Sequence, residues 1–221
     1  SSVGPNVVSG NYFQARDFNG SGDKVTIPHK NIFSGLTNVT VLAWVNTDSN
    51  SANLAVLSKG TSGVDADFCF RIDYNDRMEL VDDDGTAAVV ASSNFINIGT
   101  WTQVAWVYED GYLEAYRNGE SLGTAGPIDS ALGTNSDNLW IGAWDSSQYF
   151  NGQIDELMIW NRSLTSSEIN QLYFTNLYKY NQTDWVLYVN QSKNSSDGLD
   201  DSTYSFYASV TDKAGNYNQT Q

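Results

Sequence analysis

The chain has 221 residues, of which 40% are hydrophobic and 13% aromatic, so it can bury the core of one large domain, or of one domain with a small appendage. Its 26 acidic and 11 basic residues give a formal net charge of −15, which disfavours nucleic acid as a partner, although an acidic surface also serves solubility alone. The one cysteine excludes an internal disulfide, and no segment approaches the ~20 apolar residues of a membrane-inserted helix.

Short segments rich in Val, Ile, Thr and aromatic residues run from Tyr12 to Trp160. Gly, Asn and Asp punctuate them about every 8 to 12 residues, a rhythm that predicts an all-β sandwich or barrel. Cys69 lies in one such segment and is expected to be a small packing residue. We expect strands at residues 12–18, 24–27, 39–46, 55–59, 68–74, 78–81, 87–91, 102–108, 112–117, 139–143 and 154–160.

Two tight turns are predicted by their residue types. Asp110-Gly111 and Asn118-Gly119 supply the positive φ angles of two-residue hairpin turns, so three consecutive antiparallel strands are expected around them. Asp84-Gly85 is a candidate for a further turn, but the preceding Asp82 and Asp83 leave its register open.

One short helix is predicted after the last of these strands. Thr165 and Glu168 have the spacing of a capping box, and Leu164 and Ile169 that of a hydrophobic staple. Ile169 and Tyr173 then share one face, which we expect to pack the helix against the sheets.

The composition changes to Asn, Gln, Ser and Asp after about Phe174. Two strands are expected in this tail, at residues 185–189 and 204–210. Two strands make a marginal independent unit, so the tail is expected to pair with the main body or to belong to a neighbouring module.

Five segments, in order, resemble laminin-G-like domains of the concanavalin A-like lectin/glucanase type. They are the opening strands Ala15–Pro28, the central strand Val41–Val45, the Gly-Thr-Trp strand Gly99–Ala105, the hairpin Tyr116–Glu120 and the closing strand and helix Phe150–Tyr173. The resemblance implies an all-β, two-sheet antiparallel jelly-roll sandwich over residues 1–174, with a short C-terminal helix. Domains similar to these are carbohydrate-binding, adhesion or protein-binding modules, often with calcium.

The tail, residues 175–221, is predicted to be an appended hairpin-like segment. Residues 185–189 and 204–221, with the motif at 211–216, resemble segments of the immunoglobulin-like repeats of bacterial and archaeal surface proteins, although the early strands of such a repeat are missing. The chain begins at Ser1 without a signal-like region, so we expect a processed or excised fragment.

A catalytic function is not expected. The related β-glucan hydrolases carry a Glu-x-Asp-x-x-Glu strand, and none of the six glutamates here, Glu79 and Glu156 included, has Asp two positions later. Asp65 and Asp67, or Asp73 and Asp76, are other closely spaced carboxylate pairs, and neither pair matches that motif. His29 is the one histidine, so a catalytic triad or a zinc site has no support either.

Calcium is a more plausible ligand, because carboxylate, amide and carbonyl oxygens suit it. The resemblance implies an ion that ties the first strands to the last, with Asp155, Asn19 and Asp23 as ligands. The alternative is that Asp155 caps a turn or pairs with a base. The run Asp82-Asp83-Asp84 is a looser candidate, and such runs are commonly solvated.

Sugar binding needs an exposed aromatic ring with polar neighbours. Trp144 and Tyr149 flank a polar loop that contains Asp145 and Gln148, so these four residues are the predicted ligand site, unless the aromatic rings pack against their own loop. Trp140 fits either a core or a surface role. The tryptophans expected in the core are Trp44, Trp101, Trp106 and Trp160.

The favoured function is a non-catalytic carbohydrate-binding or adhesion module of a secreted or cell-surface protein, calcium-stabilised and bound to glycans or surface glycoproteins. Seven Asn-x-Ser/Thr acceptor sites, at Asn19, Asn38, Asn161, Asn181, Asn190, Asn194 and Asn218, weakly favour a glycosylated surface protein. The alternative is a structural spacer or protein-interaction domain that contacts neighbouring domains. A glycoside hydrolase is the third and least favoured hypothesis.

Overall fold

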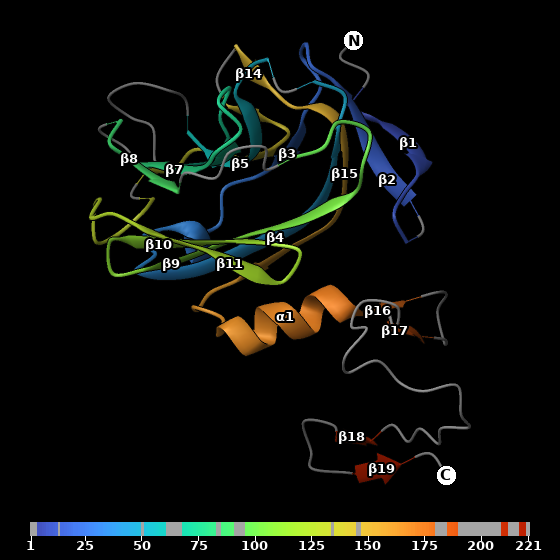
Figure 1. Cartoon of the computed structure of the whole chain (residues 1–221). Coiled ribbons are helices and arrows are strands. Elements are labelled where there is room, and N and C mark those ends of the chain that lie inside the picture. The colour runs from blue at the N-terminus through green and yellow to red at the C-terminus, as the bar shows by residue number, and fades with distance from the viewer. Residues whose placement is uncertain are drawn as a thin grey trace. The chain divides into compact units, whose positions relative to one another are not determined.

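The structure is a computed structural model, and it separates the chain into two compact units, residues 1–173 and 174–221 (Figure 1). The described residues are 4–12, 14–49, 51–60, 68–82, 85–90, 96–133, 135–144, 147–179, 185–189, 209–211 and 217–219. The assignment of the two units as separate domains stays a prediction.

The first unit contains a seven-stranded antiparallel sheet in the spatial order β1-β2-β15-β4-β9-β10-β11. The strands are β1 (Asn6–Ser9), β2 (Gln14–Asn19), β4 (Asn38–Thr47), β9 (Thr102–Glu109), β10 (Tyr112–Arg117), β11 (Glu120–Ala125) and β15 (Asn151–Trp160). The closing strand β15 therefore lies between β2 and β4, which come from the start of the chain.

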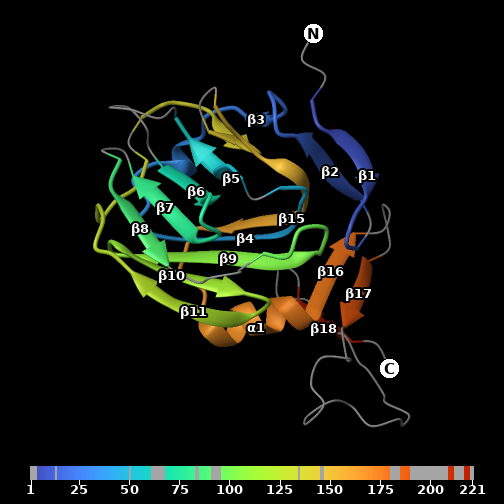
Figure 2. The same ribbon diagram turned by 45° about the horizontal axis from the view of Figure 1, so that its top comes forward.

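A six-stranded antiparallel sheet lies over the first one, in the order β3-β12-β5-β6-β7-β8 (Figure 2). Its strands are β3 (Val25–Ile27), β5 (Leu54–Lys59), β6 (Phe68–Ile72), β7 (Met78–Asp82), β8 (Ala87–Val90) and β12 (Leu139–Ile141). A short 3-10 turn, η1 (Asn31–Phe33), and a small hairpin, β13 (Ala143–Trp144) and β14 (Gln148–Tyr149), complete the β-structure of this unit.

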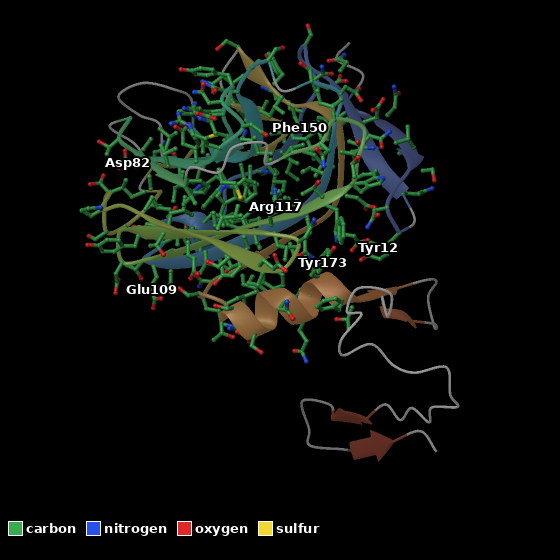
Figure 3. All side chains as sticks on the ribbon, viewed as in Figure 1. Tyr12, Asp82, Glu109, Arg117, Phe150 and Tyr173 are labelled. Carbon is green, nitrogen blue, oxygen red and sulfur yellow. The ribbon has the colours of Figure 1, made fainter. Side chains whose placement is uncertain are left out.

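The core fills the space between the two sheets, as period-two alternation predicts. On β4, Val39, Val41, Ala43 and Val45 belong to this core, and Phe150 lies between the layers at 0% exposure (Figure 3). The predicted two-sheet jelly-roll sandwich is confirmed. Trp106 is fully buried as predicted, whereas Trp101 is only half-buried.

The predicted helix is α1 (Ser166–Phe174), and its capping box is formed as expected. The Glu168 carboxylate accepts the backbone N–H of Thr165 at 2.9 Å, while the Thr165 hydroxyl accepts that of Glu168 at 3.3 Å. Leu164 and Ile169 pack with Leu42 on the outer face of the seven-stranded sheet. The helix therefore covers the face that β4 turns away from the core (Figure 1).

Both predicted hairpin turns are confirmed. The φ angles are 45° and 88° at Asp110 and Gly111, and 50° and 82° at Asn118 and Gly119, as such turns require. They join β9, β10 and β11 into consecutive antiparallel strands. At the third candidate turn Gly85 has a φ of 86°, but Asp84 lies outside the described residues.

The second unit contains two described strand pairs. β16 (Thr175–Lys179) pairs with β17 (Trp185–Val189), and β18 (Ser209–Thr211) pairs with β19 (Tyr217–Gln219), both antiparallel. The strand predicted at 185–189 is confirmed. Most of residues 204–221, which hold the second predicted strand and most of the segment that resembles immunoglobulin-like repeats, lies outside the described residues. Among the helices of the described chain, none has the length and apolar character needed to span a membrane.

Candidate functional site

The register of the six-stranded sheet places one residue from each strand in a continuous row on its outer face. The ends of this row are exposed or half-buried, but its middle is fully buried even though it points away from the sandwich core. Something therefore covers the middle of the outer face. In spatial order the row is Thr26, Trp140, Ser58, Cys69, Val81 and Ala87.

Trp144, on the β13–β14 hairpin, supplies that cover. Its side chain packs on Ala55, Cys69 and Val81, and Trp144 as a whole is 4% exposed. The expectation of an exposed Trp144 ring is wrong, because the outer face beneath the hairpin is apolar and removes the indole from water. Cys69 is a small packing residue, as predicted.

A buried polar network ties the same hairpin to the sheet. The Arg71 Nε atom donates to Glu79 Oε2 at 2.5 Å and its Nη1 atom donates to Gln148 Oε1 at 2.7 Å, while its Cζ atom lies 5.2 Å from the centre of the Trp144 ring. The Arg71 and Glu79 side chains are only 13% and 7% exposed. A hydrogen bond from the Ser58 hydroxyl to the carbonyl of Ala143, 2.6 Å long, adds a second anchor.

The half-buried ring of Trp140 lies beside this anchored hairpin. Trp140 pairs with Ser58 on one side and with Thr26 on the edge strand β3 on the other. The Lys24 ammonium lies 3.8 Å from the centre of the Trp140 ring, a cation–π contact at the rim of the sheet. An aromatic ring, a hydroxyl and a cation thus meet at this end of the face.

The predicted ligand residues come together only in part. Gln148 and Tyr149 are half-buried on β14, opposite Trp144 and Ala143. Asp145 lies outside the described residues, and the role of all four residues in ligand binding stays a prediction. The sequence reasoning left Trp140 undecided and missed Arg71, although alternation with the core residue Phe70 could have placed Arg71 on the outer face.

Asp155 holds a turn of the first strands. Its Oδ2 atom accepts the backbone N–H groups of Asn11 and Tyr12 at 2.9 and 3.3 Å, and its Oδ1 atom accepts that of Glu156 at 2.8 Å. Burial raises the pKa of Asp155, and the three backbone donors oppose that rise. This is the turn-capping alternative considered for Asp155 from the sequence.

The same carboxylate anchors an aromatic cluster on the outer face of the seven-stranded sheet. Trp44, which pairs with Asp155, stacks on Tyr173 with ring centres 5.6 Å apart and meets the Tyr12 ring edge-on at 5.7 Å. Figure 3 shows Tyr12 and Tyr173 at the same end of this sheet. The cluster therefore connects the first strands, the central strand and the end of α1.

The three residues predicted to bind calcium do not form one site. Asn19 pairs with Asn151, four residues before Asp155, which corresponds to about 13 Å along the strand. Asp23 bonds locally, accepting the backbone N–H of Asn19 at 3.1 Å. Within the described ranges, no group of three or more His, Cys, Asp and Glu residues is placed to hold a metal ion.

The other acidic candidates accept backbone N–H groups or pair with a base where they are described. Asp82 accepts the backbone N–H of Asp129 at 3.2 Å, and the remainder of the acidic run lies outside the described residues. Asp76 accepts the backbone N–H of Ile96 at 3.0 Å. Burial alone would raise the pKa of Asp73, but hydrogen bonds from Arg77 and Asn75 outweigh it and lower that pKa.

Comparisons with known proteins agree with the sandwich. A family model of the concanavalin A-like lectin/glucanases superfamily matches residues 19–170. The chain is similar to neuronal pentraxin-2 of Cavia porcellus, at 32% identity over 110 residues that cover 44% of this chain and 25% of that protein. The chain thus matches about a quarter of the length of this curated relative.

Two solved structures show the same fold at low sequence identity. Domain 4 of a GH43 extracellular arabinanase from Geobacillus stearothermophilus, in complex with arabinotriose, has a TM-score of 0.64 at 19% identity over 76% of this chain and 81% of that one. A native heptameric SAP-like pentraxin from Limulus polyphemus has a TM-score of 0.55 at 18% identity, over 71% of this chain and 80% of that one. These likenesses concern the fold alone.

Proposed function

Because this chain belongs to the concanavalin A-like lectin/glucanases superfamily, we propose that it is a non-catalytic carbohydrate-binding module of a secreted or cell-surface protein. Its ligand lies on the outer face of the six-stranded sheet, at the end formed by Trp140, Thr26 and the β13–β14 hairpin. Glycans or surface glycoproteins are the partners.

The observation that carries this proposal is the ion pair buried beneath the hairpin. A buried ion pair contributes little stability compared with apolar side chains of the same volume, because desolvation of the two charges offsets their attraction. Arg71 and Glu79 are instead placed to fix Gln148 and the Trp144 ring in one arrangement. A binding loop held in this way loses little conformational entropy when a ligand binds.

Trp140 supplies the contact that a sugar ring needs. One face of a pyranose or furanose is rich in C–H groups and stacks on an indole, while its hydroxyls require donors and acceptors nearby. Thr26 pairs with Trp140 on the neighbouring strand, and the Lys24 ammonium lies over the Trp140 ring, 3.8 Å from its centre. A sugar that stacks on this ring face displaces the flexible Lys24 side chain, which can then donate to a sugar hydroxyl. Gln148 has its carbonyl held by Arg71, and within the described part of the chain its amide N–H groups have no acceptor, so they can donate to a ligand.

The arabinanase domain supports this class of ligand, because its structure contains arabinotriose bound to a domain of the same fold. Fold likeness at 19% identity does not transfer the sugar itself. We therefore leave the sugar type to be found by a broad glycan array, with arabinotriose as the first defined probe.

The test is a calorimetric titration of the whole chain with the oligosaccharides that the array identifies. Trp140→Ala removes about 40–60 Å² of apolar stacking area, so the affinity should fall about five- to tenfold. Trp140→Tyr should retain part of it. The matched control is Tyr112→Ala, an aromatic residue 50% exposed on the other sheet, which should bind like the wild type. Silence on the array, or equal losses in Trp140→Ala and Tyr112→Ala, would contradict the proposal.

An interaction with neighbouring domains is the second candidate, favoured by one observation. β1 is the edge of the seven-stranded sheet, so its outer backbone groups have no strand partner within the described sheet, and Val7 on it is 49% exposed. Fusion to a natural neighbour should then raise the melting temperature of this chain. If the melting temperature does not change on fusion, the interaction with neighbouring domains is contradicted and carbohydrate binding is the one proposal that remains.

A further inference from the structure

The outer face of the six-stranded sheet carries one positive charge that no other charge on that face balances. Arg71 and Glu79 face each other across β6 and β7, and their ion pair leaves no net charge. Lys24 lies two residues before Thr26 of the edge strand β3, which places both residues on the outer face. Among the described residues on this face of the sheet, Lys24 is therefore the uncompensated charge.

Lys24 has an aromatic partner in place of a carboxylate. Its ammonium lies 3.8 Å from the centre of the Trp140 ring. Two acidic residues are near in the sequence, but Asp23 accepts the backbone N–H of Asn19 and Asp137 lies in the loop before β12. Neither of them forms an ion pair with Lys24 within the described chain. A chain with 26 acidic and 11 basic residues thus leaves a lysine without a carboxylate at the ring proposed to bind the sugar.

A sugar that stacks on the Trp140 ring must take the place of this ammonium. The contact that Lys24 gives up is weak, because an exposed cation–π pair changes an equilibrium constant only about two- to fivefold. The displaced ammonium stays within reach of the sugar, because a flexible four-carbon stem carries it beside the ring. The bound sugar is then the group that must supply a new acceptor for Lys24.

A carboxylate on the sugar suits Lys24 better than a hydroxyl does. Both groups accept a hydrogen bond from the ammonium, but the carboxylate also supplies the opposite charge. Near a protein surface the attraction between two charges is about four times stronger than in bulk water. An amino sugar would be repelled by the same lysine.

The rest of the surface limits the number of charges on the ligand. The net charge of −15 repels a sugar chain that carries a negative charge on every unit. At physiological salt the potential of an exposed acid decays over about 8 Å, so acids farther away than that have little effect on one carboxylate beside Lys24. The expected ligand is a mostly neutral oligosaccharide with a carboxylate on the unit that covers Trp140.

We propose that the Trp140 site selects a sugar unit that bears a carboxylate, and that Lys24 is the residue that determines this specificity. The inference rests on the proposed function, because it concerns the same ring and the same bound oligosaccharide. The wild type should bind the carboxylate form about tenfold more tightly than a neutral sugar of the same shape, because its hydrogen bond joins two opposite charges.

The test is a calorimetric titration of the whole chain with pairs of short oligosaccharides that differ only in the terminal unit. The pairs are glucose against glucuronate and galactose against galacturonate, and the methyl ester of each uronate is a neutral probe of nearly the same shape. In Lys24→Ala the uronate should lose about ten times more affinity than its neutral partners, so that the preference disappears. Lys24→Arg should keep the preference. In the wild type the preference should shrink as the salt rises from about 0.05 to about 0.5 M.

Lys30→Ala is the matched control. Lys30 is an exposed lysine three residues after β3, and its removal changes the net charge of the chain by the same amount. This variant should keep the wild-type preference for the uronate. Equal affinity of the wild type for the uronate and its neutral partners, equal losses in Lys24→Ala and Lys30→Ala, or no binding of any probe would each overturn the inference.

The proposed function is decided separately, by the affinity of Trp140→Ala for the oligosaccharides that the glycan array identifies. If neutral oligosaccharides bind through Trp140 and the uronates bind no better, the proposed function stands and the selectivity assigned to Lys24 is wrong. If Trp140→Ala binds like the wild type, the proposed function and the inference are both wrong.

Discussion

The Arg71 guanidinium donates to the side-chain carbonyl of Gln148 at 2.7 Å, joining residues 77 positions apart in the sequence. The same guanidinium is paired with Glu79, so one side chain links β6, β7 and the β13–β14 hairpin. The hairpin that borders the proposed sugar site therefore depends on a charge that lies at the centre of the sheet.

Removal of this charge should destabilise the protein. Arg71→Ala leaves Glu79 buried without its partner and should cost about 3–5 kcal/mol in the free energy of unfolding. Gln148→Ala removes one charge-assisted hydrogen bond and should cost about 1.5–3 kcal/mol. Urea unfolding of both variants and of the double variant measures the coupling, which should be about 0.5–3 kcal/mol. Additive effects would show that Gln148 does not depend on Arg71.

Asp155→Asn should destabilise the turn at Asn11 and Tyr12. An asparagine has one carbonyl oxygen in place of two carboxylate oxygens, so its NH₂ group must face at least one of the backbone donors that Asp155 accepts. The expected cost is about 1–3 kcal/mol in urea unfolding at neutral pH. Asp17→Asn on the adjacent strand is the control, within about 0.5 kcal/mol of the wild type; equal stability of Asp155→Asn and Asp17→Asn would refute this role of Asp155.

Calcium should not stabilise the chain through Asp155, Asn19 and Asp23. A structural ion at a hundred times its dissociation constant would add about 2.7 kcal/mol, or roughly 5–10 °C in Tm for a protein of this size. Because the Asp155 oxygens accept three backbone N–H groups, and Asn19, to which Asp23 bonds, lies about 13 Å away along the strand, we expect the same Tm in calcium and in chelator. A calcium-dependent rise that Asp155→Asn abolishes would show that this carboxylate does bind the ion.

Acid should remove the stabilisation that Asp73 provides. Burial by itself would raise the pKa of Asp73, but the Arg77 hydrogen bonds outweigh burial and keep that pKa below its ordinary value of 3.8. A carboxylate with a lowered folded-state pKa stabilises the protein above its unfolded pKa, and that contribution is lost as the pH falls through the folded value. Wild type should therefore exceed Asp73→Asn in unfolding free energy at pH 7, and the difference should shrink below about pH 4. A constant difference down to pH 2 would mean that Asp73 stabilises the turn without its charge.

Local signals predicted most of the fold. The strand 112–117 agrees with the structure at both ends, because Asp110-Gly111 and Asn118-Gly119 bound it with turns that few other residues can make. Residues 151–153 of β15 were missed, because Asn-Gly-Gln has no strand character of its own and is held there by pairing with β2 and β4.

The candidate site could not be predicted to the same extent. The burial of Trp144 depends on Ala55, Cys69 and Val81, which come from three strands far away in the sequence. Asp155 was predicted as a metal ligand by resemblance, and its partners at Asn11 and Tyr12 lie more than 140 residues earlier, where no local pattern reveals them. Periodicity identifies which face a residue occupies but not what covers that face.

The most direct measurement is a crystal structure of the chain with an oligosaccharide that it binds, beginning with arabinotriose. We predict sugar density over the Trp140 ring, beside Thr26 and the β13–β14 hairpin. Density confined to other surfaces, with the Trp140 end of the six-stranded sheet empty in a saturated crystal, would contradict the proposed function.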